Sequence, residues 1–409
     1  MREAWIIDAA RTPRATGKIG KGAFSDVHPQ RLLSAVLVAL VERNAFPITD
    51  VDEVIAGCNN QIGQQAYCIA RASLLDAGWD PVVPGMTVHR FCGSGLSAVK
   101  SAAMGVMSGV QSLVVAGGVE SMSHVSTHAL YPLVDAGNVH LREIHPQPHQ
   151  GICADVIATL EGITRSDADA LALESQRRAA VAIAEGRFDR GVVTVRDYDG
   201  RLLLDHEEFP RPQTTLEGLA QLKPAFASRY DVPLTDDGVT FRKLVERTFP
   251  DLVVDHIHHA GNSSGVVDGS GAVVVASDFY ARAHGLRPRA RIRAMATVGD
   301  SPELMLNAPV PAARKALASA GMTIDDIDLF EVNEAFAVVP LKFMRDLGVD
   351  PAKVNVNGGA IALGHPIGAT GAMLIGTLLD ELERQDLSTG LITMCTGGGM
   401  APAMIIERI

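Results

Sequence analysis

The chain has 409 residues, 47% hydrophobic and 20% charged, with a formal net charge of -11 and a mean hydropathy of +0.15. This composition is typical of a globular protein with two or three domains, and it excludes a fibrous repeat and a disordered chain. The acidic balance argues against a nucleic-acid partner, because phosphate contact needs a basic face. It still allows an anionic ligand held by a few local arginines and lysines.

Membrane insertion, secretion and metal binding find no support in the sequence. No apolar run approaches the roughly 18 residues of a membrane span, and the N-terminus lacks a signal-peptide pattern. The five cysteines are odd in number and have no metal-ligand spacing. We therefore expect reduced thiols, a cytoplasmic location, no transmembrane segment and no metal.

The first part of the chain alternates short apolar strands with amphipathic helices, which favours an α/β layered fold. We expect strands over 4–9, 53–57, 86–89 and 112–118, and helices over 29–43 and 96–108. Cys92 lies between the third strand and the second helix, and the last strand ends in glycines.

Residues 124–260 are irregular and rich in histidine, proline and charge. Segments of this length between regular elements are usually functional. We expect an inserted loop domain here, with one helix over 166–185.

The last part of the chain repeats the order of the first. A strand over 353–357 leads to a glycine-rich loop and a helix over 369–384, and a strand over 391–395 ends at Gly397. Strand, glycine turn, buried helix, strand and glycine turn thus occur twice, and an internal duplication is the simplest explanation. The alternative is the ordinary alternation of any α/β protein.

Cys92 precedes Gly93-Ser94-Gly95 and a helix. Unpaired N–H groups and the helix dipole at such a place favour thiolate over thiol, so Cys92 is a candidate nucleophile. A small buried cysteine at a tight turn is the structural alternative.

Three other motifs carry candidate acid–base or oxyanion-binding groups. His365 follows Gly364 and precedes Pro366, so the backbone orients an imidazole that can accept a thiol proton. Cys395 precedes three glycines, whose N–H groups can form an oxyanion hole. Asn333 begins Asn-Glu-Ala-Phe after a strand over 328–332, where a helix N-cap is the ordinary explanation. Each motif alone has an ordinary structural explanation. The occurrence of all four motifs in one duplicated pattern does not.

Combined and in this order, the motifs resemble thiolases of the acetyl-CoA acetyltransferase and 3-ketoacyl-CoA type. The resemblance runs from Ala10-Arg11-Thr12-Pro13, through 117–123 and 358–366, to the Cys395 loop, and it covers essentially the whole chain. It implies two βαβαβαββ lobes that form a five-layered α-β-α-β-α core with an inserted loop domain. The N-terminal lobe would span 1–123, completed by 261–279, the loop domain 124–260, and the C-terminal lobe 280–409.

The resemblance also implies ping-pong chemistry through an acyl-enzyme. Cys92 would take the acyl group, His365 would accept its proton, and Cys395 would be the second acid–base group. Asn333 and His365 would hold a water in one oxyanion hole, and the amides of Cys92 and Gly397 would form the other.

Coenzyme A and acyl-CoA would be substrates, with no permanently bound cofactor. By resemblance, Arg211 lies near the adenine, Ser264 contacts pantetheine, Phe226 lines the tunnel, and His149 matches a histidine beside the acyl pocket of short-chain thiolases. The family commonly forms homodimers or homotetramers, and sequence alone does not choose between them.

The chain departs from the family's pattern around the substrate. Gln150 replaces a methionine, His89 an asparagine, Met373 an arginine, and Cys153-Ala154-Asp155 replaces Thr-Ala-Glu. The stretch between Phe226 and Ala260 is much longer than usual. None of these changes removes a catalytic group, but together they point to altered acyl selectivity.

Among rival functions, a decarboxylating ketoacyl synthase does not need a second catalytic cysteine, so Cys395 argues against it. A non-catalytic lipid carrier with this fold would have lost a catalytic residue, and all four are present. We expect thiolytic cleavage of a 3-oxoacyl-CoA to acetyl-CoA or propionyl-CoA and a shortened acyl-CoA, as in fatty acid beta-oxidation. A biosynthetic acetoacetyl-CoA thiolase, which His149 favours, is the alternative.

Overall fold

Ten strands form one mixed sheet in the computed structural model, which describes residues 2–125, 133–236 and 238–409. One half has the order β4-β3-β5-β8-β1, with the short β2 on β8; the other has the order β10-β11-β12-β9. The halves join where β1 pairs with β9 at Trp5 and Arg291. The strands of the first half are β1 (Ala4–Arg11), β2 (Ala15–Thr16), β3 (Glu53–Gly57), β4 (Gly85–Val88), β5 (Leu113–Ser121) and β8 (Val267–Ser277). Those of the second are β9 (Ala290–Gly299), β10 (Leu329–Val332), β11 (Thr389–Thr393) and β12 (Met400–Arg408).

The two halves repeat one topology. In each half, counted from the outer edge of the sheet, two or three parallel strands are followed by antiparallel ones. β3 is parallel to β4 and β5, and β10 is parallel to β11. A single parallel bridge between Phe330 and Val354 takes the place of β4 in the second half. The helix α3 (Ser94–Ser108) precedes β5 as α13 (Thr370–Arg384) precedes β11. This correspondence agrees with the duplication expected from the sequence.

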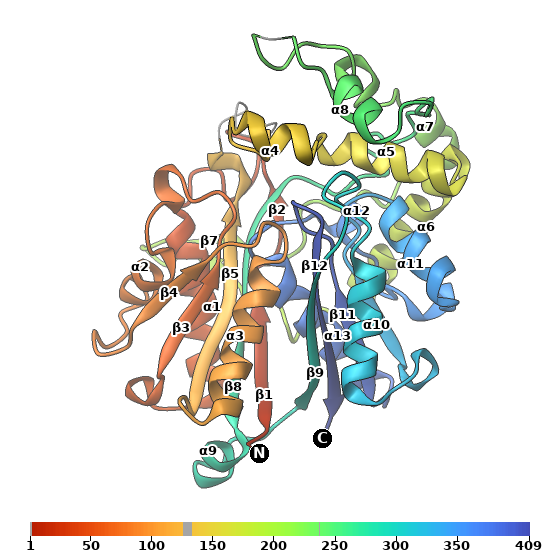
Figure 1. Cartoon of the computed structure of the whole chain (residues 1–409). Helices are drawn as coiled ribbons and strands as arrows, with labels where there is room; N and C mark the ends of the chain where they lie inside the picture. Colours follow the sequence, from red (N-terminus) through yellow and green to blue (C-terminus); the bar gives the residue numbers. More distant parts are fainter. Residues whose placement is uncertain (1, 126–132, 237) are drawn as a thin grey trace.

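Five layers follow from the alternation of side chains along the strands. In β8, Val273 and Val275 face α3 and α13, whereas Val274 faces the outer helices α1 (Pro29–Asn44) and α2 (Ile69–Asp76). In the second half, the outer layer is α10 (Pro309–Ala320) and α11 (Val338–Leu347). The central helices α3 and α13 lie between the two halves of the sheet (Figure 1). A short helix, α9 (Asp278–Ala283), follows β8 at the lower edge in that view.

Glycines let the two central helices meet at their N-termini. A Cβ atom at Gly95 would lie 2.7 Å from the Gly368 carbonyl oxygen, and one at Gly371 would collide with the backbone of Leu96. A larger residue at either position would push the helices apart. The turns that carry Cys92 and His365, the residues just before these helices, are therefore brought to one place.

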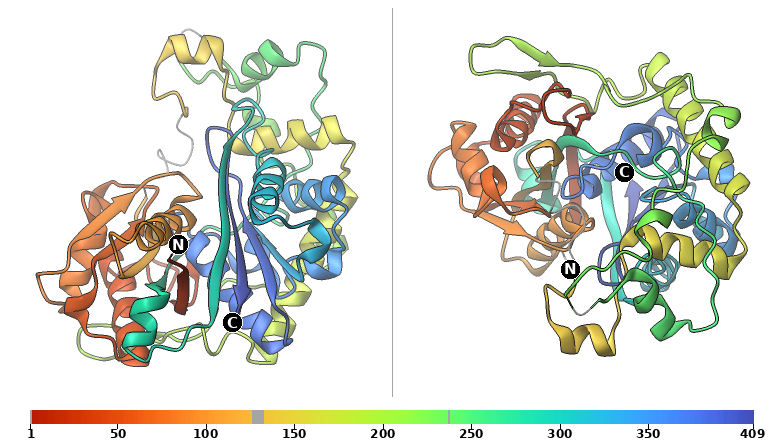
Figure 2. Two further views of the ribbon diagram at one scale, coloured as in Figure 1. Left: turned by 60° about the horizontal axis from the view of Figure 1, so that its bottom comes forward. Right: turned by 90° about the horizontal axis from the view of Figure 1, so that it is seen from above.

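The segment 133–260, which the sequence predicts to be part of an inserted loop domain, sends most of its helices over one end of the core (Figures 1 and 2), whereas its two short strands pack beside α1. It contains α4 (Val139–Ile144), α5 (Gln150–Glu161), α6 (Arg165–Ala184), β6 (Val195–Arg196), β7 (Leu202–Leu204), α7 (Leu216–Ala220) and α8 (Phe241–Thr248). The prediction of a single helix was right for α6 and wrong for the region. The other helices are short, and α5 is buried along most of its length, so the sequence shows no helical alternation there.

Other predicted elements fall within three residues of the observed ends, except the strand expected over 353–357. Asn355 has a φ of 48°, which breaks an extended strand. Its side chain instead pairs with β10, donating to the Val332 carbonyl and accepting from the Val332 N–H, both at 2.8 Å. Beyond the bridge between Phe330 and Val354, the Asn355 side chain thus takes the place of the next backbone hydrogen bonds to β10.

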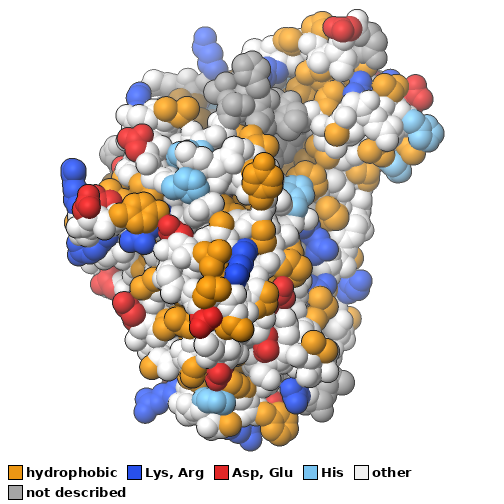
Figure 3. Space-filling view, turned by 90° about the vertical axis from the view of Figure 1, so that its left-hand side faces the viewer, with side chains coloured by type: hydrophobic (Ala, Val, Ile, Leu, Met, Phe, Trp, Pro, Cys, Tyr) orange, Lys and Arg blue, Asp and Glu red, His pale blue; other side chains and the backbone are white. Residues whose placement is uncertain are grey.

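The edge of the sheet at β4 is open to solvent, and several large apolar side chains are exposed around it: Tyr67 (92%), Val82 (64%), Met104 (48%) and Met86 (38%). Figure 3 faces this side of the molecule, where hydrophobic side chains lie among scattered charges. Within the described residues, no helix is both long and apolar enough to cross a membrane.

Candidate active site

Cys92 lies in the turn between β4 and α3, two residues before the helix begins. Phe91 before it has a φ of 47°, a left-handed conformation that is strained for an aromatic residue. The Ser94 hydroxyl stabilises the turn, because it donates to the Phe91 carbonyl at 2.6 Å and accepts from the Arg90 N–H at 2.8 Å. The thiol is thus held at the start of a buried helix, where the sequence predicted it.

The Cys92 thiol is protonated at neutral pH. Burial and the negative charge of Glu120 raise its pKa to about 12. The prediction that the helix start favours the thiolate was therefore wrong in its net effect, since loss of hydration outweighs the helix dipole. Cys92 needs a neighbouring base in order to act as a nucleophile.

His365 can be that base. It lies between α12 (Ala360–Leu363) and α13, and it is buried. The Thr370 hydroxyl lies 2.6 Å from Nδ1 and donates to the Pro366 carbonyl at 3.2 Å. Because this hydroxyl has one hydrogen, Nδ1 carries the ring proton and Nε2 is left as the acceptor. Burial and the charge of Arg14 lower the pKa of His365 to about 3, so the ring is neutral.

Asn333 follows β10, and its side-chain amide donates a long hydrogen bond to His365 Nε2 at 3.4 Å. Within the described part of the chain, the buried Asn333 Oδ1 has no hydrogen-bond partner. Buried acceptors normally have a donor, so this pair has hydrogen-bonding capacity left for a ligand. Glu334 fixes the loop by accepting hydrogen bonds from the Ser175 hydroxyl, the Asn355 amide and the Ile361 N–H, at 2.7, 3.0 and 3.1 Å.

Cys395 follows β11 and is only 1% exposed. Burial raises the pKa of its thiol, and the charge of a Cys92 thiolate raises it further, which disfavours ionisation of both thiols together. Gly397 packs against the Phe91 ring, where an added Cβ would lie 2.8 Å from a ring carbon. The Cys395 loop is thereby seated on the Cys92 turn.

Glu120, at the end of β5, ties the surrounding loops together. This fully buried carboxylate accepts hydrogen bonds from the N–H groups of Asn59, Asn60 and Gly368 at 2.9, 3.0 and 2.9 Å. It therefore joins the turn after β3 to the loop that carries His365. The sequence motif containing Glu120 was recognised, but no role was predicted for it.

These residues surround one cavity of about 450 Å³. Six predicted site residues line it: Cys92, His149, Phe226, Ser264, His365 and Gly397. Asn333 and Cys395 are buried beside it. Met305, which also lines the cavity, lies in a segment without any sequence motif. Asn59 and Asn60 line it as well and lie two and three residues after the end of β3.

Arg211 does not reach this cavity. It lines a separate outer cavity of about 200 Å³, where its guanidinium lies 5.5 Å from the centre of the Phe209 ring. The segment from Ala260 to Gly265 links the two, since Ala260 and Gly261 line the outer cavity and Ser264 and Gly265 the inner one. An extended ligand can follow this segment from the surface to Cys92.

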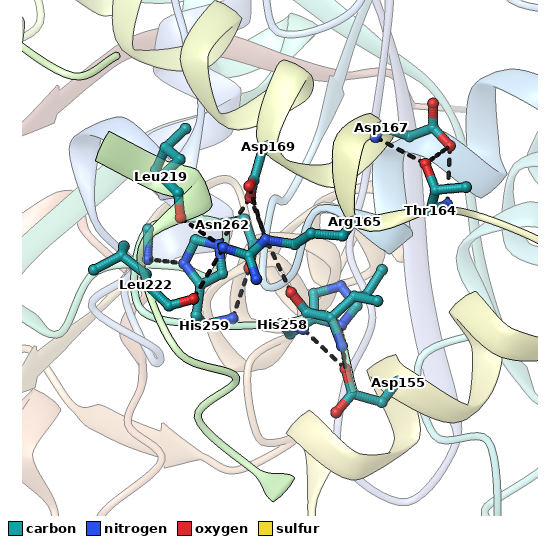
Figure 4. A network of polar contacts seen from close by, with 12 residues as sticks. Asp155, Thr164, Arg165, Asp167, Asp169, Leu219, Leu222, His258, His259 and Asn262 are labelled. Carbon is teal, nitrogen blue, oxygen red and sulfur yellow. Dashed lines mark hydrogen bonds and ion pairs between the residues drawn. The ribbon is translucent and has the colours of Figure 1, made fainter. Parts of the chain in front are cut away.

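Buried hydrogen bonds hold the start of this segment (Figure 4). Asp155 of α5 contacts the His258 ring at 2.8 Å, and Asp169 of α6 contacts the His259 ring at 2.8 Å and the Asn262 amide at 2.9 Å. Helices α5 and α6 therefore hold in place the segment that links the two cavities. Among the described residues, no group of three or more histidine, cysteine, aspartate or glutamate side chains is placed to hold a metal ion.

Two family models match the chain: "Thiolase, N-terminal domain" over residues 4–232 and "Thiolase, C-terminal domain" over 286–408. The chain belongs to the thiolase family. Among curated relatives of this thiolase, a beta-ketoadipyl-CoA thiolase of Pseudomonas aeruginosa is 41% identical, with all of both chains covered. A steroid 3-ketoacyl-CoA thiolase of Mycobacterium tuberculosis is 40% identical over all of this chain and 95% of the relative.

Solved structures agree with this assignment. The crystal structure of the Bacillus anthracis acetyl-CoA acetyltransferase superposes with a TM-score of 0.83 at 36% identity, and the match covers 100% of this thiolase and 99% of that chain.

The residues that depart from the family pattern lie in different parts of the structure. His89 and Gln150 line the inner cavity, whereas Met373 packs on Gly269 and Gly271 of β8. Of these three departures, the first two can alter acyl selectivity by direct contact.

Proposed function

We propose that this thiolase is degradative and cleaves a 3-oxoacyl-CoA with coenzyme A through an acyl-Cys92 intermediate. The observation that carries the proposal is that the Cys92 thiol and the neutral His365 imidazole line one cavity, with a second thiol, Cys395, buried two residues before the lining residue Gly397. Cys92 comes from the first repeat, and His365 and Cys395 from the second. Losing any one of them would remove a step of the reaction below.

In the first half-reaction, His365 Nε2 accepts the Cys92 proton as the sulfur attacks the 3-oxo carbon. The tautomer fixed by Thr370 supports this role, because Nε2 carries the lone pair. The bond between carbons 2 and 3 then breaks, and the electron pair on carbon 2 takes a proton from Cys395. Acetyl-CoA, or propionyl-CoA from a 2-methyl substrate, leaves, and the shortened acyl group stays on Cys92.

In the second half-reaction, Cys395 accepts the proton of an incoming coenzyme A thiol. That sulfur attacks the acyl-Cys92 thioester, and Cys92 leaves and recovers its proton from His365. The developing oxyanions accept hydrogen bonds from two groups of donors. One consists of His365 and a water held by Asn333, and the other of the Cys92 and Gly397 N–H groups.

Coenzyme A would bind along the segment 260–265, with its adenine end near Arg211 and its pantetheine arm beside Ser264. Phe226 and His149 would flank the thiol end. The two cavities joined by this segment support the arrangement. No permanently bound cofactor takes part.

For the organisation of the chain, we propose an N-terminal lobe over 1–123 completed by 261–279, a loop domain over 124–260 and a C-terminal lobe over 280–409. The open edge at β4 and its exposed apolar side chains support a homo-oligomer, a dimer or a tetramer. The five cysteines are unpaired, which supports a cytoplasmic location.

The test is coenzyme A-dependent cleavage of short, long and branched 3-oxoacyl-CoA esters, with mass spectrometry of the protein after an acid quench. The wild type should carry the acyl group on Cys92, and Cys92→Ala should carry none. Acylation of Cys92→Ala at the wild-type rate would contradict the proposal. Condensation of acetyl-CoA at a rate exceeding every cleavage would favour the biosynthetic alternative, which the likeness to an acetyl-CoA acetyltransferase supports.

A further inference from the structure

Within the described residues, no permanent cation lines the inner cavity. Its twenty lining residues include neither arginine nor lysine. The residues outside the described ranges, Met1, 126–132 and Asp237, contain neither as well. Among the described residues, three histidines line the cavity, His89, His149 and His365, and the surroundings of each disfavour a positive charge. Arg14, whose charge lowers the pKa of His365, is buried and paired with Glu207 at 3.0 Å.

His149 caps the start of α5. Its Nδ1 accepts the Gly151 N–H at 3.1 Å and so caps the helix. Protonation would remove that acceptor and set a cation against the positive end of the helix dipole. Burial lowers the pKa of His89, and burial with the charge of Arg14 lowers that of His365 to about 3.

Cations close to the cavity in the sequence are directed elsewhere. Arg90, between the two lining residues His89 and Phe91, donates to the Ser97 hydroxyl at 2.8 Å on the side of α3. Arg142 of the loop domain forms a buried ion pair with Asp135 at 2.7 Å. By contrast, the outer cavity does contain an arginine, Arg211. The site is thus equipped for an anion at its outer end and not at its inner end.

The inner walls are apolar. Met122, Val134, Met305, Phe336 and Ile367 line them, together with the Phe226 ring. Among the non-histidine side chains, uncharged amides and hydroxyls are the polar exceptions, from Asn59, Asn60, Gln150, Ser263 and Ser264. This is an environment for an apolar or neutral polar group.

We propose that this thiolase accepts uncharged 3-oxoacyl chains and rejects chains that end in a carboxylate, such as 3-oxoadipyl. The inference rests on the proposed function and concerns its substrate class. It separates the protein from the beta-ketoadipyl-CoA thiolases that it resembles at 41% identity. A terminal carboxylate would enter the cavity without a counter-ion, so the discrimination should be about 10²–10³-fold in kcat/KM.

Three substrates of equal backbone length separate charge from size. They are 3-oxohexanoyl-CoA, 3-oxoadipyl-CoA and the methyl ester of 3-oxoadipyl-CoA at its free carboxylate. Cleavage is followed by coenzyme A-dependent release of acetyl-CoA. The uncharged chain and the ester should be cleaved at least about 100-fold more efficiently than 3-oxoadipyl-CoA.

A gain-of-function variant tests the physical cause. Gln150 is exposed to the cavity at the first turn of α5, so Gln150→Arg introduces a cation without burying it in the core. This variant should raise the ratio of 3-oxoadipyl to 3-oxohexanoyl cleavage by about tenfold or more. The matched variant Gln150→Met, of similar length and without charge, should keep the wild-type ratio.

The outcomes distinguish the two levels of inference. Efficient cleavage of 3-oxoadipyl-CoA by the wild type would overturn the substrate class and leave the thiolase function standing. Equal rejection of the ester and the acid would also overturn it, because size would then explain the selectivity. Failure to cleave any 3-oxoacyl-CoA would overturn the proposed function and this inference with it.

Discussion

The hydrogen bond from His365 to Thr370 decides which ring nitrogen can accept the Cys92 proton. Thr370→Val removes the hydroxyl at nearly constant volume in a residue that is 1% exposed. The ring proton on Nδ1 then has no acceptor at the 2.6 Å position, and the alternative tautomer, with the proton on Nε2, becomes accessible. In that tautomer His365 cannot act as a base toward Cys92.

The size of the effect follows from the bond that is lost. A buried donor left without its acceptor costs about 1–3 kcal/mol. If the same free energy is what holds the reactive tautomer, acylation should slow by about 5–150-fold. The unfolding free energy should fall by no more than the cost of that one bond, so folding and acylation can be measured separately.

The assay is single-turnover acylation of Cys92 by a 3-oxoacyl-CoA, quenched in acid and read by mass spectrometry, with urea unfolding alongside. Thr370→Ser retains a hydroxyl and should acylate close to the wild-type rate. Acylation by Thr370→Val at the wild-type rate, in a folded protein, would show that Thr370 does not set the tautomer. Equal slowing in Thr370→Ser would point to packing of the threonine methyl group instead.

Three other predictions concern separate parts of the molecule. Cys395→Ala should slow carbon–carbon cleavage by about 10²–10⁴-fold in steady-state assays and acylation of Cys92 by an acyl-CoA less, because a coenzyme A thiolate leaves without a proton more readily than a carbanion does; unchanged turnover would rule out its acid–base role. Replacing 228–255 by a short linker should change acyl preference more than affinity for coenzyme A, because Phe241 of α8 packs at 6.0 Å on the His149 ring that lines the cavity; a loss confined to coenzyme A binding would contradict this. His365, with a pKa of about 3 in the fold against 6.5 ordinarily, binds its proton mainly in the unfolded chain, so stability is full above pH 6.5 and is lost as pH falls toward 3. Between pH 7 and pH 5 the loss should be about 2 kcal/mol in urea unfolding, and His365→Gln should lack this component; an identical pH dependence in the variant would contradict the assignment.

The sequence predicted the elements whose pattern is carried by many residues. The central helices α3 and α13 and the strands beside them repeat strongly enough to reveal the duplication. The strand expected over 353–357 failed because one residue, Asn355, adopts a left-handed conformation and pairs through its side chain. A periodicity argument cannot detect such an exchange.

At the site, sequence motifs identified the reactive groups but not their ionisation. The helix start beside Cys92 was read correctly, whereas the raised pKa of its thiol comes from burial and from the charge of Glu120, which lies on another strand. Thr370 was visible within the histidine motif, but its role depends on a 2.6 Å contact that only the fold creates. Met305 comes from a segment with no motif at all.

The close contact of the central helices at Gly95 and Gly371 means that activity can be lost through a change outside the substrate cavity. Each repeat contributes only part of the reactive set, so activity reports whether the two are docked. A displacement of about 1 Å at a reacting group can cost on the order of 100-fold in rate. A small molecule that wedged between these helices would therefore inhibit the enzyme without entering either cavity and without competing with coenzyme A.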